Sequence, residues 1–460
     1  MIKKNIRYVI YTIIIIILIS ISAFYKMNFY ESYSGEKQLP PELKDKTIVR
    51  LWMKKSIISP TRSYQIEKFN NTNKDNIHII FSEYKEDYYN ALRTTLASGQ
   101  GPDIFEYGFN ALMKNDQIAY LDEINMDLNK VNKDNIVYYK DKPLGIKLME
   151  NNVKFIWNKE IFKKAGLDPN KPPKNWGELI EYSNKIKNKF PDITTFAFPF
   201  KEYEDMNIAI GEPSVNSGSI YTTFWNYKEG KYDFSYAKDI LNIYRELYSK
   251  NILEEDFDKK SKNQLRSEFY QENIAMMIST YEDKAYFSNI LPLGFEVGVS
   301  NLMQVDEKNK NKYYFTNNSN FLVLNKASIE KTKDDTEQSI QEKTKKAEAV
   351  KKVYEYLVSN EVNNEILQTK NALPINVNNT TISNDVYSGY NDVNDFSNQR
   401  LDPTIFLSRN SRYELNLVLD AIKSKSSVES VIEGLNNQYK KYYDFAIDKE
   451  KFDFQYYKMK

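Results

Sequence analysis

Short apolar runs alternate with helical repeats along the first part of the chain. Residues 48–52 and 77–81 are mostly apolar runs of the kind that form buried strands. A helix is predicted over 63–70, between these strands, and large side chains recur every fourth position over 84–96, which predicts a second helix. Residues 103–107 form a third strand-like run. Strands that alternate with helices predict an α/β fold of mainly parallel sheets flanked by helices.

Two asparagines mark helix starts further along the chain. Asn158 precedes the predicted helix 159–165, and Asn175 has Glu178 three residues later, as in a capping box. Because an asparagine side-chain oxygen accepts hydrogen bonds from amides of the first helical turn, both positions predict N-caps. The alternating run 274–278 predicts another strand, and the carboxyl-terminal tail is also predicted to be helical.

The amino end carries a long uncharged run. Three cations within the first seven residues precede the segment 8–25, which contains no charged side chain. Eighteen helical residues span about 27 Å, just enough for the hydrocarbon core, and the cations place the start of the chain inside. We expect 1–25 to be an uncleaved signal anchor with a single transmembrane helix, 26–46 a tether, and the rest extracytoplasmic. The alternatives are a cleaved signal peptide, with weak small-residue sites over 20–23, and a buried core helix.

The composition excludes several classes of site. The chain has 64 Lys and Arg against 63 Asp and Glu, so no basic field favours nucleic acid. One His and no Cys exclude thiolate catalysis and zinc clusters. The two glycine motifs that bind nucleotide phosphates, G-x-x-x-x-G-K-[ST] and G-x-G-x-x-G, do not occur. We therefore expect no metal ion and no cofactor. The roughly 435 residues after the anchor suit two lobes, each with its own core.

A series of motifs follows in a fixed order. They are ASGQGPDI at 97–104, FIWNK at 155–159 with the helical segment after it, ENIAMMI at 272–278, NFLVLN at 320–325, YEYLVSNE at 354–361 and NALP at 371–374. In this order and spacing the motifs resemble the extracellular solute-binding proteins of carbohydrate ABC importers, the maltose-binding-like group.

The resemblance implies a two-lobed periplasmic-binding-protein, or Venus-flytrap, fold with ligand in the cleft between the lobes. It implies a first lobe of 47–150 and 296–347 and a second lobe of 151–295 and 348–460. The lobes of such a receptor close around the ligand, because the ligand binds the closed state better. Many relatives carry a lipidated Cys, which this chain lacks. The amino-terminal helix would then tether a monomeric receptor to the membrane beside its ABC permease.

A sugar site needs aromatic platforms together with polar donors and acceptors, because sugars present both apolar C–H faces and hydroxyl groups. Tyr107 ends the predicted strand 103–107, at the edge where open α/β sheets bind ligands. With the resemblance, the candidate ligand-binding residues are Trp52, Tyr107, Asn110, Glu150, Asn151, Asn152, Glu212, Trp225, Tyr281 and Asn318. The alternatives are lobe core for Trp52, a turn for Asn110 and an exposed carboxylate for Glu212.

The leading hypothesis is a membrane-tethered extracytoplasmic receptor, not an enzyme, that binds a carbohydrate and delivers it to an ABC permease. An oligosaccharide is the expected ligand. Two alternatives remain open at this point: a cell-surface glycan-active hydrolase, which needs two carboxylates about 5 to 9.5 Å apart, and a binder or sensor of a non-sugar solute. A receptor closes on its ligand and leaves it unchanged, whereas a hydrolase releases a product.

Overall fold

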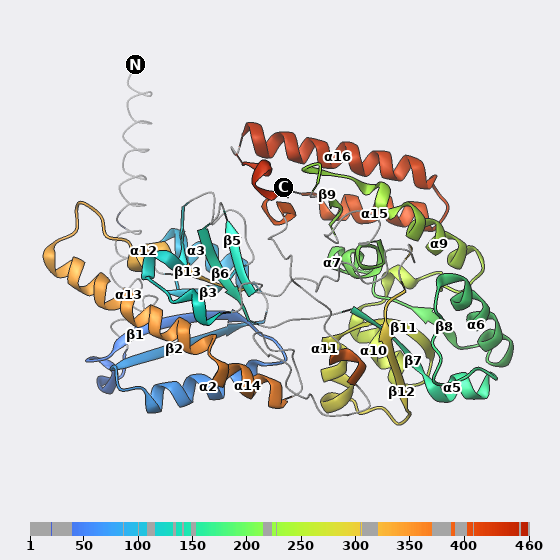
Figure 1. Cartoon of the computed structure of the whole chain (residues 1–460), viewed down its shortest axis with the longest axis horizontal. Coiled ribbons are helices and arrows are strands. Elements are labelled where there is room, and N and C mark those ends of the chain that lie inside the picture. The colour runs from blue at the N-terminus through green and yellow to red at the C-terminus, as the bar shows by residue number, and fades with distance from the viewer. Residues whose placement is uncertain are drawn as a thin grey trace, which may run out of the picture.

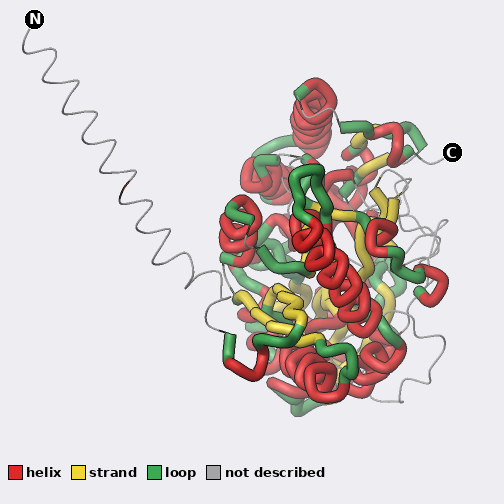
Figure 2. Tube along the Cα trace, turned by 90° about the vertical axis from the view of Figure 1, so that its left-hand side faces the viewer, coloured by secondary structure: helices red, strands yellow, loops and turns green. Residues whose placement is uncertain are grey.

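The computed structural model has two lobes, which lie side by side in Figure 1, the first on the left and the second on the right. The residues that it describes are Ser20, 39–85, 87–99, 101–107, 116–131, 135–139, 142–148, 153–214, 223–226, 228–303, 305, 321–369, 388–391, 403–407, 409–449 and 452–458. Seen from the side of the first lobe, helices lie on the outside and strands within (Figure 2). Each lobe is therefore a sheet covered by helices.

The first lobe is built on a seven-stranded sheet of order β2-β1-β3-β13-β6-β5, with β4 paired to β13. Its strands are β1 (Thr47–Lys54), β2 (Ile77–Tyr84), β3 (Ile104–Glu106), β4 (Ile118–Ala119), β5 (Ile136–Tyr139), β6 (Lys142–Lys147) and β13 (Phe321–Asn325). Strand β1 runs parallel to β2 and β3, but β13 runs antiparallel to β3, β4 and β6. The sheet is therefore mixed, and the expectation of a mainly parallel sheet was wrong for this half.

Helices cover both faces of the first sheet. They are α2 (Ser59–Thr72), α3 (Tyr88–Ala97), α12 (Lys326–Ile329), α13 (Glu337–Leu357) and α14 (Asn360–Thr369). The phenol of Tyr354 fixes α13 to the central strands, because it donates to the Leu322 carbonyl at 2.6 Å and accepts from the Ile146 amide at 2.8 Å. Tyr354 has no exposed surface, so this polar group is buried with both hydrogen bonds made.

The second lobe is built on a four-stranded sheet of order β12-β7-β11-β8. The strands are β7 (Val153–Asn158), β8 (Thr194–Ala197), β11 (Ile274–Thr280) and β12 (Val297–Asn301), with a separate hairpin-like pair of β9 (Trp225–Asn226) and β10 (Lys231–Tyr232). Strand β7 runs antiparallel to β11 and β12, and β11 runs parallel to β8. This sheet is also mixed.

Several helices cover the second sheet, and two of them, α5 and α6, begin where the sequence predicted N-caps. The helices are α5 (Lys159–Lys164), α6 (Trp176–Lys189), α7 (Tyr203–Met206), α8 (Glu212–Ser214), α9 (Lys238–Ser249), α10 (Lys262–Tyr270), α11 (Tyr281–Ala285), α15 (Ser411–Ile422) and α16 (Val428–Asp448). The Asn158 side chain accepts from the amides of Glu160 and Ile161, and the Asn175 side chain accepts from that of Glu178. Both N-cap predictions are confirmed.

Short helical turns complete the fold. The 3-10 turns are η1 (Pro41–Leu43), η2 (Leu121–Ile124), η3 (Leu128–Lys130), η7 (Phe234–Ala237), η8 (Phe257–Lys259), η11 (Ser388–Asn391), η12 (Pro403–Phe406) and η13 (Phe454–Tyr457). Two π-helical turns, η5 (Asn207–Gly211) and η9 (Tyr286–Ile290), lie in the second lobe. Such turns are rare and often occur at functional sites.

The sheets divide the chain differently from the expected lobe limits at two places. We expected 296–347 in the first lobe and 348–460 in the second, but β12 pairs with β7 of the second sheet. Conversely, the later half of α13 packs into the core of the first lobe, and α14 packs against α2. The chain thus stays in the second lobe as far as Val305, whose amide donates to the Pro213 carbonyl, rather than leaving it near residue 296. It stays in the first lobe as far as Thr369, the end of α14, rather than leaving it near residue 348.

The expected membrane segment falls outside the described residues apart from Ser20. Across the residues that the structure does describe, no helix combines the length and the apolar character needed to cross a bilayer. The expected tether, 26–46, is described only from Leu39 onward.

Candidate functional site

The candidate site comprises the edge of the first sheet and the edge of the second sheet that a short segment of chain connects. Strand β6 ends at Lys147 and β7 begins at Val153, so only the five residues 148–152 join the two sheets. An extended chain of this length spans at most about 20 Å. The carboxyl ends of β1 and β3 lie at the first of these edges, and the carboxyl end of β11 lies at the second.

A row of aromatic side chains lines the first edge. The Trp52 ring lies 4.7 Å from that of Tyr84, between centroids, and Tyr84 contacts Tyr88 at 5.8 Å. Tyr89 follows at 5.4 Å from Tyr88, and the Lys54 ammonium lies 4.1 Å from the centre of the Tyr89 ring. Trp52, Tyr84 and Tyr89 are half-buried, so parts of these rings face solvent. Such surfaces suit the C–H faces of a ligand.

Tyr107 lies beside this row, at the end of β3. Its ring stacks on Phe321, with centroids 4.8 Å apart, and its hydroxyl is buried without a hydrogen-bond partner. Burial raises the pKa of Tyr107, so the hydroxyl keeps its proton and remains a donor. A buried donor without an acceptor is unfavourable, and a ligand oxygen would relieve that cost.

A buried arginine lies behind the same edge. The guanidinium of Arg62 in α2 is 1% exposed, and none of its nitrogens makes a hydrogen bond. Burial lowers the pKa of Arg62 to about 10, although Tyr356, Glu106 and Glu365 act in the opposite direction. The Glu106 carboxylate also accepts from the Lys54 amide at 3.1 Å. Arg62 therefore places positive charge beside the carboxylate that immediately precedes Tyr107.

The second edge carries a buried polar network at the end of β11. The Asp283 carboxylate accepts from Arg266 Nε at 2.6 Å, from Ser279 Oγ at 2.8 Å and from the Thr280 amide at 2.8 Å. Because Ser279 donates to Asp283, the hydroxyl of Tyr390, 2.6 Å from Ser279 Oγ, is the donor in that pair. The network connects α10, β11 and η11, and it holds Tyr390 against the second edge.

Two buried lysines flank this network. Lys154 at the start of β7 donates to Asn301 Oδ1 at 2.6 Å, and Lys284 donates to the Tyr281 hydroxyl at 3.3 Å. Neither lysine has exposed surface. Tyr281 is itself buried and meets Tyr390 edge to face, with centroids 6.2 Å apart. The second edge thus combines phenols with ammonium groups.

Glu212 follows the π-helical turn Asn207–Gly211 and is buried, contrary to the alternative of an exposed carboxylate. Burial raises its pKa well above the ordinary value, which favours the neutral carboxyl, a form that can donate as well as accept. The Ser214 hydroxyl and the side-chain Oδ1 of Asn207, both nearby in the chain, have no hydrogen-bond partner.

Apart from Glu212, which follows η5, the sequence-predicted site residues separate into four groups. Trp52 and Tyr107 come together at the first edge, and Tyr281 lies at the second. Trp225 lies instead in the core of the second lobe, because its ring has no exposed surface, packs against Tyr232 and donates to the Tyr457 carbonyl. The candidates outside the described residues are Asn110, Glu150, Asn151, Asn152 and Asn318.

Several residues of the two edges were not predicted. They are Lys54, Arg62, Tyr84, Tyr89, Lys154, Ser279, Asp283 and Tyr390. Tyr84 ends β2 in the structure, but the four-residue repeat over 84–96 assigned it to the following helix, which in fact begins at Tyr88, so the sequence did not place it at the edge. Within the described segments, no three His, Asp or Glu side chains gather as metal ligands would.

Comparison with known proteins identifies the family. The sequence pattern of the family described as bacterial extracellular solute-binding protein matches residues 55–364, more than half of the chain. The chain belongs to this family. Its members are solute-binding proteins, so the coarse function of this solute-binding protein is recognition of a solute outside the cytoplasm.

Solved structures agree on the fold of this solute-binding protein. The ABC substrate-binding protein from Listeria monocytogenes in complex with cycloalternan is 16% identical, with a TM-score of 0.60 over 86% of this chain and 99% of that one. The cyclic α-maltosyl-1,6-maltose binding protein from Arthrobacter globiformis is 14% identical, with a TM-score of 0.63 over 86% and 98%. At such identities the comparison establishes the two-lobed fold.

Curated relatives match a smaller part of the chain than the solved structures do. The sn-glycerol-3-phosphate-binding periplasmic protein of Salmonella typhimurium is 31% identical over 137 residues, which are 26% of this solute-binding protein and 31% of the relative. The chain thus spans under a third of the length of the curated relatives that it matches.

Proposed function

We propose that this solute-binding protein is a carbohydrate receptor that binds an oligosaccharide between its lobes and delivers it to an ABC permease. The observation that carries the proposal is the aromatic row at the first edge, Trp52 with Tyr84 and Tyr89, beside the buried hydroxyl of Tyr107. Half-buried rings supply platforms for sugar faces, and the unpartnered hydroxyl supplies a donor for a sugar oxygen. Neighbours of the same fold that are named for oligosaccharides support it.

The second lobe supplies the opposing wall in this proposal. Tyr281 and Tyr390 meet the ligand from the far side on closure, and the Glu212 carboxyl, whose burial favours the neutral form, contributes one donor. The residues 150–152, where the chain passes between the lobes, and Asn110 and Asn318 are proposed as further polar contacts. The apolar segment 8–25 is proposed to hold the receptor at the membrane as a monomer.

A ligand screen tests the proposal. The full-length chain in mild detergent is heated with each of a series of mono- and oligosaccharides and with sn-glycerol 3-phosphate, the ligand named for the curated relatives. A ligand at 100 times its dissociation constant stabilises the folded state by about 2.7 kcal/mol, which is a measurable rise in Tm. We expect a rise with one oligosaccharide series, and chromatography should recover the sugar intact.

Two variants connect the binding to the proposed edge. Trp52→Leu and Tyr107→Leu should each weaken the sugar affinity about fivefold or more, since truncation of an aromatic contact costs about 1 kcal/mol or more in such sites. Tyr64→Leu is the matched control, because Tyr64 is 58% exposed on the outer helix α2. A rise in Tm with glycerol phosphate alone would replace the sugar by a phosphorylated polyol, and release of a cleaved sugar would make the protein a hydrolase.

A further inference from the structure

The carboxyl-terminal segment 452–458 is anchored on the second lobe. The Phe452 amide donates to a carbonyl of the last turn of α16 at 3.0 Å, and the ring of Phe454 is buried. The Tyr457 carbonyl accepts from Trp225 Nε1 at 3.3 Å, within the core of the second lobe. The segment 452–458 therefore moves with the second lobe.

One ring of this segment contacts the first lobe. The Phe452 ring lies 6.2 Å from the Tyr139 ring, between centroids, with an angle of 36° between the planes. Tyr139 ends β5 of the first sheet, and its ring packs against buried residues of both lobes. Burial, and to a smaller extent the charges of Tyr120 and Asp453, raises the pKa of Tyr139 to about 12. The phenol of Tyr139 is thus within electrostatic reach of the carboxyl-terminal segment.

The contact lies away from the point where the chain crosses between the lobes at 148–152. Lys142 lies opposite Tyr139 in the register of β5 with β6, and Lys147, just before the crossover, is five residues further along β6. At about 3.3 Å per residue, these five residues cover about 17 Å of strand. A rotation of the lobes about the crossover therefore moves the two rings relative to each other.

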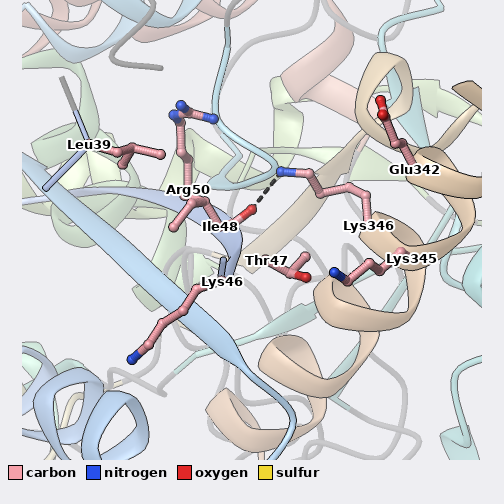
Figure 3. Close-up of a pocket in the computed structure, with 8 residues that line it drawn as sticks. All are labelled: Leu39, Lys46, Thr47, Ile48, Arg50, Glu342, Lys345 and Lys346. Carbon is pink, nitrogen blue, oxygen red and sulfur yellow. Dashed lines mark hydrogen bonds between the residues drawn. The ribbon is translucent and has the colours of Figure 1, made fainter. Parts of the chain in front are cut away.

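Helices are tied to the sheet within each lobe, so a contact between the lobes acts on whole lobes. In the first lobe the Lys346 ammonium of α13 donates to the Ile48 carbonyl of β1 at 2.5 Å and to the Asp103 carboxylate at 3.2 Å. Figure 3 shows Lys346 reaching from α13 to β1 beside a pocket of about 340 Å³. In the second lobe the Asp283 carboxylate joins α10 to the end of β11.

We propose that the segment 452–458 is a latch between the lobes, and that its Phe452 ring, packed on Tyr139, holds the lobes in the arrangement of this structure when no solute is bound. An aromatic pair shifts an equilibrium between two states by about two- to tenfold. The latch therefore sets how often the lobes of the unliganded protein separate. It depends on contacts within the chain and not on the identity of the ligand.

Distances between two spin labels on the full-length chain in mild detergent test the proposal. Because the chain contains no Cys, Asp122→Cys in η2 and Asn437→Cys in α16 supply the only two attachment sites. Both residues are exposed, one on each lobe, and η2 adjoins β6. Without added solute, Phe452→Ser should increase the population at longer distances about two- to tenfold. Tyr139→Ser should have the same effect, whereas Tyr139→Phe keeps the ring and should match the parent.

Two further variants separate the latch from general loosening of the fold. Phe445→Ser is the matched control, because this ring is 50% exposed on α16, and its distances should match those of the parent. The double variant Phe452→Ser/Tyr139→Ser should exceed neither single variant, since each alone already breaks the contact. Circular dichroism identifies the variants that fold, and if Phe452→Ser does not, Tyr139→Ser carries the test against Tyr139→Phe.

Three results would overturn the proposal. The first is a parent distance distribution in the folded variants that lack either ring. The second is an equal change in Phe445→Ser. The third is a change in the double variant that equals the sum of the two single changes, because the two rings would then act independently.

Discussion

The ring of Tyr107 stacks on that of Phe321, with a centroid distance of 4.8 Å and an angle of 26° between the planes. The two residues come from antiparallel strands, and the Tyr107 amide donates to the Phe321 carbonyl at 2.8 Å. This contact fixes the ring at the first edge while its hydroxyl lacks an acceptor.

Tyr107→Phe separates stability from binding. Because the buried hydroxyl has no partner, its removal should leave the free energy of unfolding unchanged or raise it by up to about 1 kcal/mol. If the hydroxyl donates to the ligand, the same variant lowers the affinity at least fivefold. Urea unfolding without ligand and calorimetry with it measure the two effects. A clear loss of stability in the unliganded protein would show that the hydroxyl has a structural partner.

Trp225→Leu should reduce stability more than ligand affinity, and Trp52→Leu should reduce ligand affinity more than stability. Trp225 has no exposed surface and packs among Tyr232 and Phe454, so its truncation should cost about 3 kcal/mol or more in unfolding free energy. Ligand affinity, measured on the folded fraction, should remain within about twofold of the parent. Trp52 is half-buried at the first edge, and its truncation should reduce affinity more than stability. If Trp225→Leu instead reduced ligand affinity more than stability, Trp225 would belong to the ligand site.

Asp283→Asn tests the network at the second edge. Three donors converge on this carboxylate, and an amide offers only one oxygen to them. The variant should lose about 3 kcal/mol of unfolding free energy, because it breaks a buried ion pair and leaves the Arg266 guanidinium buried. Arg266 then keeps only its contact with Glu282, at 3.3 Å. Glu246→Gln breaks an exposed pair with Lys250 and should cost under about 1 kcal/mol in the same urea titration. Equal losses in the two variants would mean that the network is unimportant.

Glu212 should make stability depend on pH. Burial raises its pKa in the folded state, so its favourable contribution is complete below the ordinary pKa of 4.5 and is lost as the pH rises toward the folded-state pKa. For one proton the slope reaches about 1.4 kcal/mol per pH unit. Glu212→Gln removes this loss, so the variant should gain stability relative to the parent between pH 5 and pH 8. Parallel pH profiles of the two proteins would contradict the burial of an unionised carboxyl.

Gly145→Ala tests the packing of β6 against β13. A Cβ at this position would lie 2.2 Å from the Leu322 carbonyl oxygen, a backbone atom that cannot turn aside. We expect a cost of about 3 kcal/mol or a failure to fold. Gly294→Ala is the control, because no atom lies within 4 Å of its Cβ, and its Tm should match that of the parent. A Gly145 variant with the parent Tm would show that β6 can shift on the sheet.

Local sequence signals predicted the positions of helices and strands better than they predicted which strands pair and in which direction. The N-caps at Asn158 and Asn175 depend on adjacent residues only, and both are present. The direction of β13 depends on which strands it meets in space, and no periodicity in 321–325 distinguishes an antiparallel place from a parallel one. The sheets were therefore expected to be mainly parallel and are mixed.

The same distinction between local signals and long-range contacts applies to the residues of the candidate site. Trp52 and Tyr107 end predicted strands, so the rule that ligands bind at carboxyl edges located them. Trp225 has the same residue type but lies between Tyr232 and Phe454, a contact made by distant segments of the chain. Tyr390 was missed because its role depends on Ser279, far away in sequence, rather than on any local motif.

Strand β13 has a consequence for biosynthesis. It lies between β3 and β6 in the first sheet, but all four strands of the second sheet are synthesised after β6 and before β13. A nascent chain that stops short of residue 321 therefore has every strand of its second sheet, while its first sheet remains in three separate parts with open edges: β2-β1-β3, β5-β6 and the unpaired β4. The sheet of the first lobe is consequently completed after the sheet of the second lobe, although it begins earlier in the chain. Chaperones or export machinery that bind the nascent chain before β13 emerges would encounter unpaired strand edges in the first sheet.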